Sequence, residues 1–250
     1  MFDLKGKTAL VTGSSQGIGF AIAKLLQERG AKVFIHGGRD AQKCADASLL
    51  IENSIPVMAD LSEKDVCDKL YEMTGGVDIL VLNASAQVYG GVGEITEEDF
   101  ERQFSVNVKS SMMLMQKYIP YMKEQGFGRI VTVGSVNQHN QHPRLLLYAA
   151  TKTAQMKLVQ SVAKEVAPYG ITVNNIAPGV VLTPRNDAVL SDEEYKKKVM
   201  EKIPCGFAGM AEDIAPTVLL LCSNEGRYIT GADIIIDGGM HLKVMRSDTV

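Results

Sequence analysis

The sequence predicts an α/β fold: a single-domain, doubly wound parallel sheet of about seven strands with helices on both faces. Short apolar runs rich in β-branched residues alternate with amphipathic stretches along the whole chain, a pattern typical of βαβ units. Most of these runs are almost continuously apolar, as expected when helices cover both faces of a parallel sheet. Because no linker, repeat or low-complexity segment interrupts the alternation, we expect one domain over residues 1–250.

The predicted strands and helices alternate in the order that βαβ units require. Strands are expected at Ala9–Thr12, Lys32–His36, Pro56–Ala59, Asp78–Leu82, Arg129–Val133, Thr172–Ile176 and Ile234–Asp237. Helices are expected at Ile18–Arg29, Ser62–Met73, Glu97–Lys123, Leu146–Ala167 and Glu212–Cys222. Right-handed crossovers between these parallel strands would bring their carboxyl ends to one edge of the sheet.

Composition and charge narrow the class of protein. Hydrophobic residues make up 46% of the 250 residues and charged residues 22%, which favours a folded globular chain over a disordered one. The formal net charge is −3 and the pI is near 5.9, so we expect neither a nucleic-acid nor a membrane partner. No apolar run approaches the ~20 residues that span a bilayer, and the first residues lack the pattern of a signal peptide. We therefore expect a cytoplasmic protein.

Cysteine and histidine spacing does not favour a disulfide or metal framework. The four cysteines are scattered without a CxxC pair, which favours reduced thiols. His139 and His142 lie three residues apart, but in a polar loop without clustered Cys or Asp. We expect no metal site.

A glycine-rich turn, Thr12–Gly19 (TGSSQGIG), directly follows the first predicted strand. Gly13 would permit the tight turn, Gly17 would let the backbone approach a pyrophosphate, and Gly19 would let the helix pack closely on the strand. The helix that begins near Gly17 would offer unpaired N–H groups and a positive dipole end to phosphate. Between a strand and a helix, the turn predicts dinucleotide binding at the switch point of a Rossmann-like sheet rather than a purely structural turn.

Tyr148 and Lys152 lie near the start of the predicted helix Leu146–Ala167. Four residues are close to one helical turn, so the phenol and the ammonium would stand on the same face. A nearby ammonium favours the phenolate and would lower the pKa of Tyr148 from about 10 toward neutrality, where an acid or base works best. Taken alone, the pair is equally compatible with two side chains that decorate a helix.

Ser135 favours the catalytic interpretation of that pair. It follows the predicted strand Arg129–Val133 and should emerge at the carboxyl edge, where open α/β sheets bind their ligands. Its hydroxyl could donate a hydrogen bond to a substrate oxygen as negative charge develops there. The alternative is an ordinary serine in a strand-to-loop turn.

With these motifs, the chain resembles the short-chain dehydrogenase/reductase family over essentially its whole length. The Thr12–Gly19 turn is similar to the family's TGxxxGIG. Ser135, Tyr148 and Lys152 match the family's catalytic Ser, Tyr and Lys in order and spacing. Asn107 matches the helix asparagine that completes the family's catalytic tetrad through a water bound to the lysine.

Further matches to the family lie along the rest of the chain. Asp60 resembles the aspartate that contacts adenine, and Asn83 lies where the family has NNAG, although Leu82 and Ser85 replace its first Asn and its Gly. Residues 178–183 resemble the PGxxxT segment that holds the nicotinamide amide, and residues 229–231 and 237–239 match the C-terminal signature. The predicted cofactor-binding set is Gly13, Ser15, Gln16, Gly17, Ile18, Gly19, Arg39, Asp60, Leu61, Asn83, Tyr148, Lys152, Pro178, Gly179, Val181 and Thr183.

The resemblance implies an NAD(P)(H)-dependent oxidoreductase that moves a hydride between nicotinamide and a carbonyl or secondary alcohol. Tyr148 would be the acid in reduction and the base in oxidation, and Lys152 would lower its pKa and hold the ribose. Ser135 would polarise the carbonyl, and Asn107 would position a relay water. One rival is a dehalogenating relative, which would lack the glycine turn. Another is a catalytically silent dinucleotide-sensing or scaffold protein, which would have lost catalytic positions.

The substrate end of the site is less determined. Residues 184–209, with Pro184, Pro204, Gly206 and a charged helix at Asp192–Lys202, look like a mobile substrate lid. The loop at residues 136–147 is rich in Gln, His and Asn, and it is either a solvated loop or a contact surface for a polar substrate. An oxoacyl thioester, a sugar or polyol, and a ketosteroid all remain open as substrates.

The end of the second strand favours NADP(H) over NAD(H). The acid that would bond the ribose 2′-hydroxyl of NAD is expected about 20 residues past the glycines, and Gly37 occupies that position. Arg39 could contact a 2′-phosphate with its forked guanidinium. Two features oppose this choice: Gln16 stands where many phosphate-preferring relatives have Arg or Lys, and Asp40 could reach the ribose hydroxyls.

The resemblance also implies a homotetramer of 222 symmetry, in which the two longest helices pair across a twofold axis. The alternative is ordinary packing of amphipathic helices within one chain. The apolar residues on which the tetramer prediction depends are Met112, Met113, Met115, Tyr118, Met156, Leu158 and Val162.

Overall fold

The computed structural model describes residues 1–184, 186 and 191–242, and these residues form one seven-stranded sheet in the order β3-β2-β1-β4-β5-β6-β7. The strands are β1 (Thr8–Val11), β2 (Lys32–Gly37), β3 (Ile55–Met58), β4 (Ile79–Leu82), β5 (Gly128–Val133), β6 (Ile171–Pro178) and β7 (Asp233–Ile236). Each strand is parallel to its neighbours. The predicted fold class is confirmed, and the strand ends differ from those predicted by at most two residues.

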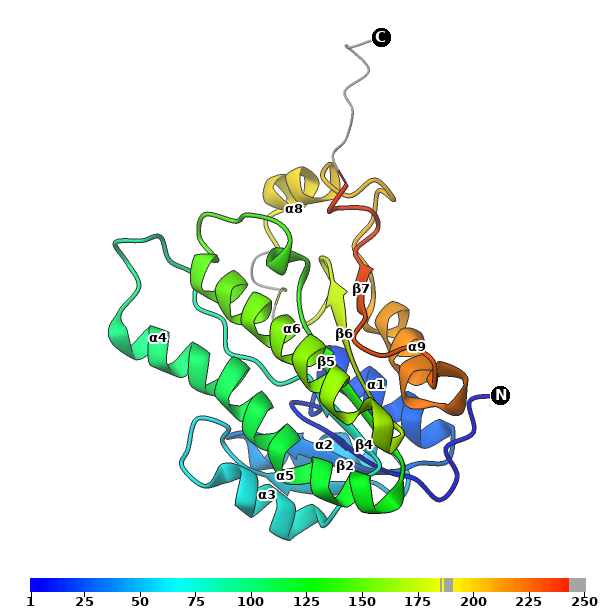
Figure 1. Cartoon of the computed structure of the whole chain (residues 1–250). Coiled ribbons are helices and arrows are strands. Elements are labelled where there is room, and N and C mark those ends of the chain that lie inside the picture. The colour runs from blue at the N-terminus through cyan, green and yellow to red at the C-terminus, as the bar shows by residue number, and fades with distance from the viewer. Residues whose placement is uncertain (185, 187–190, 243–250) are drawn as a thin grey trace.

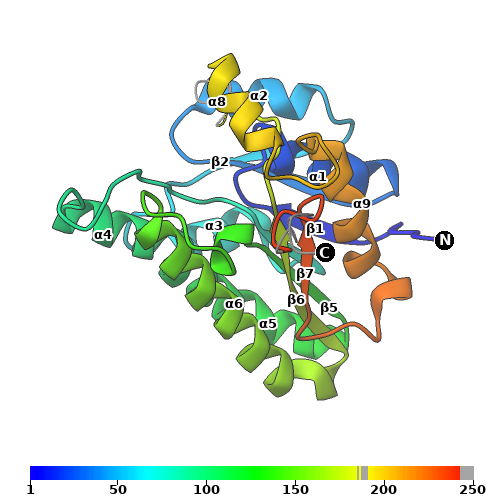
Figure 2. The same cartoon turned by 90° about the horizontal axis from the view of Figure 1, so that it is seen from above.

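Helices cover both faces of the sheet (Figures 1 and 2). They are α1 (Gly17–Glu28), α2 (Ala41–Leu49), α3 (Val66–Thr74), α4 (Glu97–Phe104), α5 (Ser110–Gln125), α6 (Leu146–Val166), α8 (Glu193–Met200) and α9 (Ala211–Cys222). Side chains of α1, α2 and α9 form one buried core with the sheet, and those of α3, α5 and α6 form a second core. Because both faces are buried, the strands need the continuous apolar character seen in the sequence.

Helix α2 was not among the predicted helices. Four of its nine residues are polar, and Cys44 and Ala47 are its buried residues. The Asp40 side chain accepts a hydrogen bond from the backbone N–H of Lys43 at 2.9 Å and thereby caps the helix. The apolar periodicity of so short a segment is too weak to indicate a helix, so the cap and the contact with the sheet decide it.

The predicted helix Glu97–Lys123 is interrupted. Residues Ser105–Lys109 form a π-helical turn between α4 and α5. Two serine hydroxyls donate to backbone carbonyls of this turn: Ser110 to Val106 O at 2.6 Å, and Ser111 to Asn107 O at 2.9 Å. Single π turns of this kind are common at functional sites.

The strand order places a ligand crevice beside β1. The chain winds from β1 to β2 and β3 on one side and continues with β4 on the other, and the carboxyl ends of β1 and β4 flank the point where the winding reverses. In Figure 1, α8 lies beyond the carboxyl ends of β6 and β7. Within the described residues, no helix is long and apolar enough to cross a membrane.

Candidate active site

The glycine turn between β1 and α1 is packed so closely that side chains would not fit. Gly13 has φ +62°, and a Cβ there would lie 2.9 Å from the Cα of Ala84. A Cβ on Gly19 would lie 2.4 Å from Asn83 Nδ2. The amide of Asn83 donates to the carbonyls of Thr12 and Gly13, each at 2.9 Å. Asn83 therefore ties the end of β4 to the turn, and the missing side chains of both glycines make room for that contact.

The N-terminus of α1 faces the pocket without a cap. Gln16 is the N-cap residue, but its side chain makes no capping hydrogen bond, and the first turn of α1 carries no acidic residue. Gly17 has φ +58°, and a Cβ there would reach to 3.4 Å from Thr183 Cγ2. Uncapped N–H groups and the helix dipole favour an anion at this end. The bare backbone and the uncapped helix therefore fit the pyrophosphate of a dinucleotide.

His36 on β2 supports the turn from beneath. Its Nδ1 accepts a hydrogen bond from the backbone N–H of Gly13 at 3.0 Å, and its Nε2 donates to the Ala59 carbonyl at 2.9 Å. Burial lowers the pKa of His36 to about 4, so the ring is neutral at pH 7 and can accept and donate at once. Sequence reasoning missed this residue, although a histidine inside an apolar strand is a usable signal.

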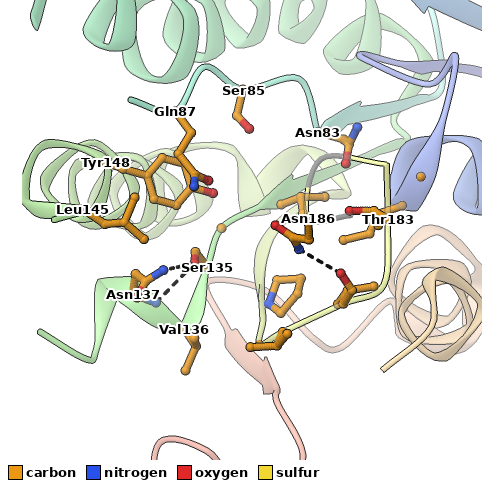
Figure 3. Close-up of a pocket in the computed structure, with 18 of the residues that line it drawn as sticks. Asn83, Ser85, Gln87, Ser135, Val136, Asn137, Leu145, Tyr148, Thr183 and Asn186 are labelled. Carbon is orange, nitrogen blue, oxygen red and sulfur yellow. Dashed lines mark hydrogen bonds between the residues drawn. The ribbon is translucent and has the colours of Figure 1, made fainter. Parts of the chain in front are cut away.

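A pocket of about 390 Å³ lies at the carboxyl edge of the sheet. Thirteen of the predicted site residues line it: Gly13, Ser15, Gln16, Gly17, Ile18, Gly19, Asn83, Ser135, Tyr148, Pro178, Gly179, Val181 and Thr183. Figure 3 shows Ser135 and Tyr148 on one side of the pocket and Asn83 and Thr183 on the other. The fold thus brings together the ends of β1, β4, β5 and β6.

Ser135 lies at the start of a short 3-10 turn after β5. Its Oγ accepts hydrogen bonds from the backbone N–H of Asn137 at 3.2 Å and from Asn137 Nδ2 at 3.3 Å. Tyr148, on the first turn of α6, is 6% exposed and lines the same pocket. Both hydroxyl-bearing side chains are therefore held at the pocket wall by ordered elements rather than by a free loop.

Lys152 and Asn107 lie behind that wall instead of lining the pocket. Lys152 is buried, and its Nζ lies 5.7 Å from the centroid of the Tyr148 ring. Asn107, within the π turn, accepts from the Ala86 N–H and donates to the Ala86 carbonyl and to Thr151 Oγ1, at 2.8 to 2.9 Å. Its side chain joins the segment after β4 to α6, which fixes the helix that carries Tyr148.

Three predicted cofactor residues lie outside the pocket, at the ends of β2 and β3. Arg39 Nε donates to Asp60 Oδ2 at 2.5 Å, and Leu61 is buried in the second core. Burial raises the pKa of Asp60, but hydrogen bonds from Ser62 and Arg39 outweigh this and lower it to about 2. The sheet register places these two strands side by side, so Arg39 and Asp60 lie together on the β2–β3 side of the turn.

The polar loop after Ser135 divides into two parts. Gln138 Nε2 donates to Asp233 Oδ2 on β7, and His139 Nε2 lies 2.8 Å from the same oxygen. Asn137 and His142 instead line the pocket. The loop is therefore partly a brace against β7, which neither interpretation predicted, and partly pocket wall. Among the described residues, no cluster of three or more His, Cys, Asp or Glu could hold a metal ion.

Comparisons with known proteins agree with this geometry. Residues 13–241 match a family model described as Enoyl-(Acyl carrier protein) reductase. The chain is 35% identical to a 3-oxoacyl-[acyl-carrier-protein] reductase, FabG, of Rickettsia prowazekii, over 96% of this chain and 99% of that protein. It is also 35% identical to a glucose 1-dehydrogenase of Gluconobacter oxydans, over 95% of this chain and 92% of that protein.

A solved 3-oxoacyl (acyl-carrier-protein) reductase from Agrobacterium tumefaciens with NADP bound is also similar. It superposes with a TM-score of 0.91 at 37% identity, covering 95% of each chain. A putative gluconate dehydrogenase from the same organism superposes with a TM-score of 0.92 at 31% identity, covering 97% of this chain and 99% of that one. These relatives are named as enzymes, and none supports a catalytically silent protein. The chain belongs to the short-chain dehydrogenase/reductase family and is an NAD(P)-dependent oxidoreductase that transfers a hydride between the nicotinamide and a carbonyl or alcohol.

Proposed function

We propose that this oxidoreductase prefers NADP(H) and interconverts a polar ketone and its secondary alcohol, with Tyr148 as the acid and base. The observation that carries the proposal is one pocket with two unlike walls. The uncapped N-terminus of α1 lies on one wall, and the hydroxyls of Ser135 and Tyr148 lie on the other. The first suits a pyrophosphate, and the second suits the oxygen of a substrate that is being reduced.

The side chains divide the work of proton transfer and charge stabilisation. When bound, the nicotinamide would supply or accept the hydride. Tyr148 would give its proton to the substrate oxygen in reduction and take it back in oxidation. Ser135 Oγ accepts both bonds from Asn137, so its own hydrogen can be donated to that oxygen. The Lys152 ammonium, close to the Tyr148 ring, would favour the phenolate.

The acid and base role is tested by Tyr148→Phe, which removes only the phenolic oxygen. Turnover with a panel of ketones and polyols should fall by about 10²- to 10⁴-fold, while NADPH binding, followed by its fluorescence, should stay nearly unchanged. Tyr195→Phe is the matched control, because Tyr195 also lines the pocket but lies on α8. Lys152→Met should lose as much activity and should also weaken NADPH binding. Activity of Tyr148→Phe within about tenfold of the parent would refute the assignment.

The preference for NADP(H) is supported by the end of β2. A Cβ on Gly37 would lie 2.8 Å from both Cys44 Cβ and Met58 Sδ, so the position expected for an acid has no room for one. Asp40, the other candidate acid, is engaged as the N-cap of α2. Arg39 is exposed and contacts Asp60 through Nε, and its terminal nitrogens suit a 2′-phosphate.

The substrate end of the pocket favours a hydroxylated substrate that carries an anionic group. Amide side chains from three segments line it: Gln87, Asn137 and Asn186. Lys202, just after α8, lines the pocket as well, and within the described residues it forms no ion pair. Burial lowers the pKa of His142, and the charges of Lys202 and Arg144 lower it further. A lysine that forms no ion pair with the described residues, beside neutral hydrogen-bonding groups, suits a carboxylate or phosphate on a polar ketone.

This substrate class is tested by comparing an anionic and a neutral ketose, 5-keto-D-gluconate and D-fructose, in Lys202→Met. The KM for the anionic ketose should rise by about tenfold, the value of one well-placed charge, while the KM for fructose should not change. Lys197→Met is the control, because Lys197 is an exposed lysine of α8 that does not line the pocket. A parent enzyme that reduces both ketoses with equal efficiency would contradict the proposal.

The segment beyond the substrate end of the pocket was expected to be a substrate lid. Pro184, Asn186, Tyr195, Val199 and Lys202 line the pocket, which supports a substrate lid within 184–209; residues 185 and 187–190 of that range lie outside the described residues.

Of the residues on which the tetramer prediction depends, Met115, Tyr118 and Val162 are buried within the chain. Exposed apolar side chains on α4, α5 and α6, namely Phe100, Met113 and Leu146, still support a homotetramer. Light scattering that shows a stable monomer at micromolar concentration would exclude it. All four cysteines are free thiols, which supports the proposed cytoplasmic location.

A further inference from the structure

The ammonium of Lys152 is buried, with 1% of the residue exposed. A buried charge is tolerated only when hydrogen bonds satisfy it. Lys152 Nζ donates to the Val133 carbonyl at the end of β5, at 2.8 Å, and to Gln155 Oε1, one turn along α6, at 3.0 Å. Gln155 is itself fully buried, so a polar side chain occupies a core position of α6 beside the proposed catalytic lysine.

The orientation of the Gln155 amide follows from its other contact. Gln155 Nε2 donates to Ser111 Oγ at 2.7 Å, and Ser111 donates its hydroxyl hydrogen to the Asn107 carbonyl at 2.9 Å. Because that hydrogen is already committed, Ser111 Oγ can act toward Gln155 only as an acceptor. The NH₂ group of the amide must then face Ser111, and its oxygen must face Lys152.

The opposite orientation of the amide would place two N–H donors against an ammonium, a buried repulsion with no compensating bond. The carbonyl that accepts from Ser111 belongs to Asn107, a residue of the π turn. The hydrogen bonds from Lys152 through Gln155 and Ser111 to Asn107 therefore all run in the same direction. Each group donates to the next, and the last acceptor is the backbone carbonyl of Asn107.

We propose that Gln155 is a positioning residue that holds the Lys152 ammonium beside Tyr148, with Ser111 and the Asn107 carbonyl fixing the direction of its amide. This inference rests on the proposed function and goes beyond it. In this chain, the side chains of Gln155 and Ser111 link the Lys152 ammonium to the backbone carbonyl of Asn107. A carboxamide neither gains nor loses a proton near neutral pH, so Gln155 does not relay protons. Its role is to fix the position of the Lys152 charge. The Val133 carbonyl and the Gln155 amide, which accept hydrogen bonds from Lys152, are both neutral.

The test titrates Tyr148 directly, without cofactor or substrate. In protein labelled with [ζ-¹³C]tyrosine, the Tyr148 signal is assigned as the one missing from Tyr148→Phe. Gln155→Met keeps the length of the side chain but removes the acceptor, so the ammonium is less firmly held and the phenolate less stabilised. The pKa of Tyr148 should rise by about one pH unit, a tenfold change in its ionisation constant.

Ser111→Ala separates positioning from simple packing, because Ser111 bonds to the amide of Gln155. Alone, it should raise the pKa of Tyr148 by less than Gln155→Met does, since the amide is then free to turn. In the Gln155→Met background it should add nothing, because the amide that it orients is gone. Shifts that add in the double variant would show two independent structural effects and would overturn the proposal.

Gln160→Met is the control for the chemical change, at an exposed position of the same helix, and it should leave the Tyr148 titration unchanged. Thermal melting establishes that each variant is folded. A parent protein that reduces no carbonyl with NADPH would refute the proposed function, while the titration would still test Gln155. An active parent whose Tyr148 titrates identically in Gln155→Met would refute the positioning role alone.

Discussion

The wall of the pocket that carries the glycine turn depends on close packing around its backbone, whereas the wall that carries Ser135 and Tyr148 depends on polar bonds between side chains. On the first wall, the side chains of Asn83 and His36 bond to the peptide groups of residues 12 and 13, and there is no space for a Cβ on Gly13 or Gly19. On the second, Asn137 holds Ser135, and Gln155 holds Lys152. The first wall should therefore fail when a single atom is added, and the second when a functional group is removed.

The largest effect that separates the walls is expected from Gly19→Ala. The new Cβ would lie 2.4 Å from Asn83 Nδ2 and 2.5 Å from the Gly13 carbonyl oxygen, so the turn must move. We expect NADPH binding to weaken by about a hundredfold or more, with a stability loss of about 1–3 kcal/mol from overpacking. Gly93→Ala is the control, because a Cβ there meets nothing within 4 Å. Calorimetric titration that gives parental affinity for Gly19→Ala would contradict the rigid-wall description.

A smaller effect, on stability, is expected from His36→Gln. The pKa of His36 is about 4 in the folded chain and about 6.5 when unperturbed, so the unfolded chain takes up the proton first as the pH falls. The stability that this neutral ring contributes is complete above about pH 6.5 and is lost as the pH falls through about 4. Between pH 7 and pH 4 the parent should lose about 2–3 kcal/mol that His36→Gln does not lose.

Urea unfolding at the two pH values measures this difference. His142→Gln is the matched comparison, since the pKa of His142 is also lowered but the residue is only partly buried and lies outside the turn; it should remove less of the acid sensitivity than His36→Gln does. If the midpoints of the parent and His36→Gln fell by equal amounts on acidification, the support beneath the turn would not depend on the neutral ring.

The smallest effect is expected beyond both walls, at the exposed Arg39–Asp60 pair. Arg39→Ala should raise the KM for NADPH by about tenfold and leave the KM for NADH unchanged, because only NADPH carries the 2′-phosphate. Arg39→Lys should recover part of the loss, since it keeps the charge but not the fork. Equal or better catalytic efficiency with NADH in the parent enzyme would overturn the preference.

Much of the fold and part of the site could be predicted because they depend on neighbours in sequence. Continuous apolar runs predict strands buried on both faces, and β1 to β7 follow them closely. The turn at Thr12–Gly19 lies between a strand and a helix, which is all that its chemistry needs. Tyr148 and Lys152 share a helix, so their proximity follows from helical spacing alone.

What only the tertiary structure decided depends on residues far apart in the chain. The π turn at Asn107 exists beside α6, whose Thr151 receives the asparagine side chain. In the sequence, Gln155 is an ordinary polar residue of a helix. Only the fold brings it to Ser111, 44 positions away, which sets the direction of its amide. His36 likewise acquires its role from Gly13 and Ala59, which follow two other strands, β1 and β3. A buried polar group must find its partners wherever the fold places them, and periodicity along the chain carries no record of those partners.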